Sequence, residues 1–131
     1  MGLSERRAAK EFQERQFPDL QAKLHAAAGT AVALTVEWDA LQTDDEAHLY
    51  EEAWREVYFT PLIGALAAIT IDDLGRDAVR AKLRQIAIRN SGTRVIAFLG
   101  GMLMLDLPPT TNIGDVKQRQ AEIQRVLEQG L

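Results

Sequence analysis

The chain has 131 residues, of which 47% are hydrophobic and 26% are charged, and it contains no cysteine. These proportions are those of one ordinary globular domain, and they exclude a disordered chain, a collagen-like repeat and a coiled coil. The lack of thiols excludes disulfide scaffolds, thiolate catalysis and cysteine-based zinc sites, and it is compatible with a reducing compartment. We expect a single domain over residues 1–131.

Helical and strand patterns follow one another in the order α-α-β-α-α-α-β-β-β-α. Apolar residues at helical spacing indicate the helices, and strict alternation over residues 30–38 indicates a strand. Pro18 and Pro61 each suit the first turn of a new helix, so the chain should break before each of them. The expected elements are helices at residues 4–16, 18–28, 46–59, 61–69, 72–83 and 113–129, and strands at residues 30–38, 85–90, 94–99 and 102–107.

The stretch from residue 85 to residue 107 holds three short apolar runs separated by turn formers. Gly100-Gly101 can take the positive φ angles of a two-residue hairpin turn. The pattern therefore predicts an antiparallel β-meander over residues 85–107, joined by the strand at residues 30–38. The predicted fold class is α+β, a small, mainly antiparallel four-stranded sheet packed against helices. The helix at residues 61–69 is apolar nearly all round, so it should be the most buried one, with Ala65 and Ala68 inside.

The formal net charge of −4 hides a segregation along the chain. Residues 37–56 contain eight acidic residues against one basic residue, a local net charge of −7. Residues 76–94 contain six basic residues against one acidic residue, a local net charge of +5. The basic segment has no interleaved aromatic residue, and we expect no nucleic-acid binding.

The signatures of catalysis and of cofactor binding are absent. The only histidines are His25 and His48, and there is no Gly-x-Ser-x-Gly elbow and no glycine-rich phosphate loop. Asp45, His48 and Glu52 share a helix face at metal-ligand spacing, but no second ligand pair accompanies them, so a solvated face is the preferred interpretation. We expect no catalytic residue, no cofactor, no metal and no enzymatic activity.

Membrane insertion and export are not expected either. The longest apolar run, at residues 62–69, has about half the length that a membrane-spanning helix needs. Residues 1–7 lack the apolar stretch of a secretory signal. We therefore expect a cytoplasmic protein.

The acidic segment is the predicted partner-binding surface. Tyrosine and tryptophan are frequent both in cores and in interfaces, so the stripe of Tyr50, Trp54 and Tyr58 fits either role, and Trp38 could extend it as an interface. Charge complementarity would favour a protein partner with a basic surface. The predicted binding residues are Trp38, Asp39, Asp44, Asp45, His48, Glu51, Glu52 and Arg55.

Three functional hypotheses follow from these patterns. The leading one is a non-catalytic protein-binding module, in the style of small acidic bacterial inhibitors such as immunity proteins, which neutralise a partner toxin; the analogy is one of size and charge alone. The second is a ligand-binding or enzymatic domain with a pocket between sheet and helices, in which Asp72, Asp73 or Asp106 supplies the polar group. The third is a structural module that forms homodimers or other homo-oligomers.

Overall fold

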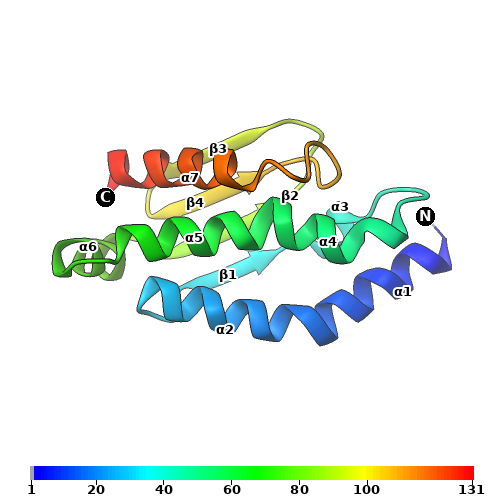
Figure 1. The fold of residues 1–131 in the computed structure, drawn as a ribbon, viewed down its shortest axis with the longest axis horizontal. Coiled ribbons are helices and arrows are strands. Elements are labelled where there is room, and N and C mark those ends of the chain that lie inside the picture. The colour runs from blue at the N-terminus through cyan, green and yellow to red at the C-terminus, as the bar shows by residue number, and fades with distance from the viewer. Residues whose placement is uncertain (1) are drawn as a thin grey trace.

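The computed structural model describes residues 2–131 and has two layers, with helices lying across one face of a four-stranded sheet. Figure 1 shows α2, α5 and α7 side by side over the strands, with the N-terminus at the end of the molecule that carries α3 and α4 and the C-terminus at the opposite end, near α6. The α+β class is confirmed. The elements are α1 (Leu3–Glu11), a π-helical turn η1 (Phe12–Gln16), α2 (Phe17–Ala28), β1 (Ala33–Val36), α3 (Trp38–Leu41), a 3-10 turn η2 (Ala47–Leu49), α4 (Tyr50–Trp54), a π-helical turn η3 (Arg55–Phe59), α5 (Thr60–Ile69), α6 (Asp73–Lys82), β2 (Gln85–Arg89), β3 (Val95–Leu99), β4 (Met102–Asp106) and α7 (Val116–Gly130).

The strand order is β1-β2-β4-β3, which corrects the predicted meander. β4 lies between β2 and β3, so β2 and β3 do not pair. The β1–β2 and β2–β4 pairs are parallel and only β3–β4 is antiparallel, so the sheet is mixed rather than mainly antiparallel. The sequence pattern specifies the strands and the tight hairpin, but it does not specify which of β3 and β4 lies beside β2. In the structure the central strand β4 has three buried side chains, whereas both ends of the edge strand β3 are exposed.

The hairpin between β3 and β4 forms as predicted. Gly100 and Gly101 have φ angles of 60° and 83°, and they join strands whose end residues, Leu99 and Met102, are paired. Positive φ at both turn positions is the requirement of the type I′ geometry, which glycine meets without strain from a Cβ atom.

The two prolines do not separate helices, contrary to the prediction. α1, η1 and α2 form one continuous helical stretch, and so do α4, η3 and α5. In each stretch a π-helical turn lies just before the proline, Pro18 or Pro61. Proline lacks an N–H group and clashes with the carbonyl of the preceding turn, and a wider turn accommodates both effects without ending the helix.

The core lies between α5 and the central strands. Leu62, Ala65 and Leu66 of α5 are fully buried, as predicted for this helix, whereas Ala68 is only half-buried. On the sheet side, the buried residues are Ile86, Ile88, Leu103 and Leu105. Alternate residues of β2 and β4 thus point into the helical layer, as strand geometry requires.

α6 begins very close to the end of α5, and Gly75 allows this approach. The Asp72 carboxylate accepts a hydrogen bond from the Gly75 N–H at 2.8 Å and so caps α6, which confirms the predicted helix start. A Cβ atom added to Gly75 would overlap the carbonyl oxygen of Ile69 and lie 2.8 Å from its carbonyl carbon. The close packing of these two backbones therefore requires glycine at position 75.

Candidate functional site

The predicted partner-binding residues gather at one end of the molecule, near the N-terminus. Figure 1 shows α3, α4 and the start of α1 together at this end. Trp38 and Arg55 are half-buried, and the other predicted residues, Asp39, Asp44, Asp45, His48, Glu51 and Glu52, are exposed. We call the surface formed by these eight residues the acidic end.

Carboxylates of the acidic end face solvent without cationic partners. In the part of the chain that the structure describes, the only ion pair within the segment 37–56 joins Arg55 and Glu56 at 3.5 Å. Asp39 and Glu51 approach only the amide groups of Gln42 and Gln16, at 3.5 and 3.4 Å. The negative charge of this surface is therefore available to a partner.

The loop of the acidic end is fixed by buried groups beneath it. The Tyr50 hydroxyl accepts a hydrogen bond from the Thr43 N–H and donates one to the Thr43 carbonyl oxygen, both at 2.8 Å. The Asp45 N–H donates to the Glu5 carboxylate at 3.1 Å, and this hydrogen bond lowers the pKa of Glu5. Asp45 has a φ of 62°, a conformation that aspartate tolerates better than most residues. Glu5 thus adds one more negative charge beside the loop.

Trp38 is held against an aromatic cluster on one side and open on the other. Its ring centroid lies 5.0 Å from that of Phe17 in an edge-to-face contact, and 5.8 Å from those of Phe12 and Trp54. It also lines two shallow surface hollows next to Asp39. A fixed, half-exposed tryptophan beside a charged surface has the properties of an interface anchor.

The stripe of Tyr50, Trp54 and Tyr58 belongs to the core, which settles an alternative that the sequence left open. Each of these side chains is at most 1% exposed, and Tyr50 stacks on Trp54 with ring centroids 4.5 Å apart. The Tyr58 hydroxyl donates to the Leu107 carbonyl oxygen at 2.5 Å, and burial raises the pKa of this phenol. The stripe therefore cannot be the binding surface, although it supports Trp38 from below.

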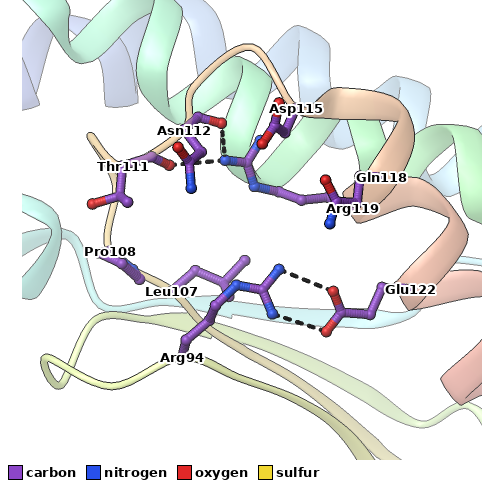
Figure 2. Close-up of a pocket in the computed structure, with 9 residues that line it drawn as sticks. All are labelled: Arg94, Leu107, Pro108, Thr111, Asn112, Asp115, Gln118, Arg119 and Glu122. Carbon is purple, nitrogen blue, oxygen red and sulfur yellow. Dashed lines mark hydrogen bonds and ion pairs between the residues drawn. The ribbon is translucent and has the colours of Figure 1, made fainter.

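A second candidate is a polar pocket between the start of β3, the loop after β4 and α7 (Figure 2). Its volume is about 190 Å³. Arg119 is only 5% exposed and donates to the carbonyl oxygens of Thr111 at 2.9 Å, Ile113 at 3.3 Å and Asn112. Burial lowers the pKa of Arg119, and nearby Asp115 partly opposes this effect. The pocket is lined by Arg94, Leu107, Pro108, Thr111, Asn112, Asp115, Gln118, Arg119 and Glu122.

The charged groups of this pocket largely satisfy one another. Figure 2 shows Arg94 and Glu122 in a two-pronged pair, with N···O distances of 3.0 and 2.9 Å. This pairing raises the pKa of Arg94 and lowers the pKa of Glu122. With two arginines, Asp115 and Glu122, the pocket has no net charge excess. Its geometry suits the support of the loop at residues 107–115 and the binding of a small polar molecule.

The three aspartates proposed for an enzymatic pocket lie elsewhere and have structural partners. Asp72 caps α6, and Asp73 forms an exposed ion pair with Arg76. Asp106 is 1% exposed and accepts hydrogen bonds from the Arg89 Nε at 3.0 Å, the Ser91 N–H at 2.8 Å and the Ser91 hydroxyl at 2.7 Å. Burial alone would raise the pKa of Asp106, but the hydrogen bonds from Ser91 and Arg89 outweigh it and lower the pKa.

Sequence reasoning missed the polar pocket for identifiable reasons. Arg94 and Glu122 are 28 positions apart, and no spacing rule connects them. Arg119 was one of many polar residues on the last helix, and its burial depends on the loop that folds over it. A signal was nevertheless present, because Arg119 lies between Val116 and Ile123 on the apolar face of α7.

Two further properties bear on function. Over residues 2–131, no group of three or more histidine, cysteine, aspartate or glutamate side chains is arranged to hold a metal ion. Within the same residues, no helix has the length and apolarity needed to cross a membrane.

The chain was also compared with known proteins. No protein-family model matches it, and neither the curated proteins nor the solved structures yielded a relative.

Proposed function

We propose that this chain is a non-catalytic protein-binding module whose acidic end occupies a basic surface of a partner protein. One observation carries the proposal: the exposed carboxylates of Asp44, Asp45 and Glu52 have no cation within 4 Å among residues 2–131. Like charges held together without partners repel one another and cost stability, and a basic partner would relieve that repulsion. An inhibitor or immunity-type protein that blocks a toxin or an enzyme acting on nucleic acid is the version that fits the size and the charge.

Two further features support a binding role. The hydrogen bonds of Tyr50 and Glu5 hold the acidic loop in one conformation, so little conformational entropy is lost when a partner binds. Half-exposed Trp38 adds apolar contact area beside the charges. Charges of this kind act mainly on the association rate, and a tryptophan anchor acts mainly on the dissociation rate.

The test separates the effect of the acidic end on binding from the effect of the overall net charge. A partner is recovered from the source cell with the full chain as bait, and its binding kinetics are measured at low and high salt. The test variant combines Asp44→Asn, Asp45→Asn, Glu51→Gln and Glu52→Gln. We expect its association rate to fall roughly tenfold or more at low salt and much less at high salt, because salt screens the native attraction.

A control variant removes the same number of charges elsewhere, through Asp19→Asn, Asp73→Asn, Asp77→Asn and Glu128→Gln. These four residues are exposed and lie outside the acidic end. We expect the control to bind nearly as fast as the parent, and Trp38→Ala to raise the dissociation rate. Equal loss of association rate in both variants would show that only net charge matters, and unchanged kinetics in the test variant would remove the acidic end from the mechanism.

The polar pocket supports a second candidate function, the binding of a small polar molecule. Its lining offers amide, hydroxyl and guanidinium groups around a volume of about 190 Å³. The binding-module proposal ranks first because the pocket's arginines already have partners, whereas the carboxylates of the acidic end do not.

A further inference from the structure

The sheet has an exposed apolar edge that the acidic-end proposal does not use. β3 is the last strand of the order β1-β2-β4-β3, and only one of its sides pairs with another strand. On this strand Leu99 is 79% exposed and Val95 is 38% exposed. Both point to the face of the sheet away from the helices, since their neighbours Ile96 and Phe98 pair with the buried residues of β4.

This edge lacks the devices that normally prevent strands from pairing with another molecule. The residues of β3 are Val, Ile, Ala, Phe and Leu, without a lysine, a proline or any charge. Along the free side of an edge strand, alternate N–H and C=O groups have no strand partner. The opposite edge, β1, is shorter by one residue, contains Thr35 and is followed by Glu37. Of the two edge strands, β3 is therefore better suited than β1 to pair with a strand of another molecule.

We propose that two copies of this chain pair through their β3 strands, antiparallel and around a two-fold axis at Ala97, to form one continuous eight-stranded sheet. In this register, Val95 lies opposite the partner's Leu99, and Ile96 lies opposite the partner's Phe98. The two exposed apolar residues of each copy thus cover each other. Residues directly opposite in an antiparallel pair have Cβ atoms about 5 Å apart, close enough for such contacts.

The strand suits pairing with a second copy because its pattern of large and small apolar residues is the same in both directions. Large apolar residues occupy both ends, and the small residue Ala97 occupies the centre, where the two strands cross the axis. No like charges meet: Arg94 precedes the strand and is already paired with Glu122 of its own copy, and it would lie opposite the partner's Gly100. In a contact with C2 symmetry each copy uses the same edge strand, so no free β3 edge remains and assembly stops at the dimer.

The first test uses the absence of cysteine from the chain. Ala97→Cys places one thiol on the proposed axis, where the Cα atoms of the two copies would be about 4.5–5.5 Å apart, within the range of a disulfide. Mild oxidation is expected to give a covalent dimer in high yield. The control is Thr35→Cys, an exposed residue on the same face but on the opposite edge, where the two copies would be roughly 30 Å apart. We expect no cross-link there.

The second test checks the register by sedimentation equilibrium of the full chain. Val95→Lys with Leu99→Lys places like charges opposite each other and should raise the dimer Kd by about tenfold or more. Val95→Lys with Leu99→Glu places opposite charges there in both halves of the dimer and should restore association. Thr35→Lys should leave the Kd unchanged.

Three results would overturn the proposal. One is that the parent chain stays monomeric at all accessible concentrations and that the Ala97→Cys variant does not cross-link. Another is a Lys/Glu variant as weak as the Lys/Lys variant, which would refute the register. The third is loss of the dimer on Thr35→Lys, which would indicate stacking through the open sheet face instead. None of these measurements involves the acidic end, so they leave the proposed function unaffected.

Discussion

Replacing Gly75 with alanine is expected to lower the free energy of unfolding by about 2–4 kcal/mol, because its new Cβ atom would overlap the backbone of Ile69. Helix propensity alone predicts the opposite sign, a gain of up to about 1 kcal/mol for glycine to alanine inside a helix. The clash involves the backbone carbonyl of Ile69, which no side-chain rotation can relieve. α5 and α6 would have to move apart, and the cost of that movement exceeds the gain in propensity.

Gly64 provides a matched control for this prediction. It lies in α5, and the atoms nearest to a Cβ atom there would all belong to the side-chain end of Gln120, which can rotate away. Gly64→Ala should therefore be neutral or stabilising by up to about 1 kcal/mol. Urea denaturation of both variants measures the two free energies. Gly75→Ala protein as stable as the parent would show that the helix junction is looser than described.

The second large effect is expected from Asp106→Ala. This change removes three hydrogen bonds at a nearly fully buried carboxylate, and it leaves Ser91 and Arg89 without their acceptor. Two of these three bonds come from a neutral donor and one from a charged donor, so we expect a loss of about 2–4 kcal/mol of stability at pH 7. Asp77→Ala, at an exposed ion pair on α6, serves as the control and should change stability little.

The same carboxylate predicts a pH dependence. The pKa of Asp106 is lower in the folded chain than in the unfolded chain, so the unfolded chain binds more protons in acid. Its stabilising contribution is therefore complete above the unfolded pKa of about 4 and is lost as the pH falls through the folded pKa. In Asp106→Asn, urea midpoints should fall less steeply below pH 4 than in the parent. Parallel curves for the two proteins would contradict this assignment.

Local patterns predicted most of the elements, but the strand expected at residues 30–38 is only Ala33–Val36, and Trp38 begins the short helix α3. Three predicted features depend on neighbours in sequence, and all three are present: the helix at residues 61–69, the hairpin at Gly100-Gly101 and the helix start at residue 72. The position of β4 between β2 and β3 depends on pairing between strands that are distant in sequence, and the periodicity of each strand does not encode it. The π-helical turns before Pro18 and Pro61 likewise depend on the packing that keeps each long helix intact.

The candidate sites show the same division. The exposed carboxylates of the acidic end were predictable, because charge on the outer face of a helix stays in water. The role of Tyr50, Trp54 and Tyr58 was not, because an aromatic stripe looks the same in a core and in an interface. Arg119 could not be assigned from its spacing alone, since its three acceptors are backbone carbonyls of a loop rather than side chains.

The insertion of β4 between β2 and β3 has a consequence for how the chain folds. Only a two-residue turn separates β3 from β4, whereas 48 residues separate β1 from β2. Contacts between near residues cost the least loop-closure entropy, so we expect the hairpin to form first, β2 to join it next, and β1 to dock last. The free energy of the opening that exposes the amides of β1 to solvent should then be smaller than the one for β4. Native-state hydrogen exchange measures both free energies. Equal protection of the two strands would show that the sheet opens only as one unit.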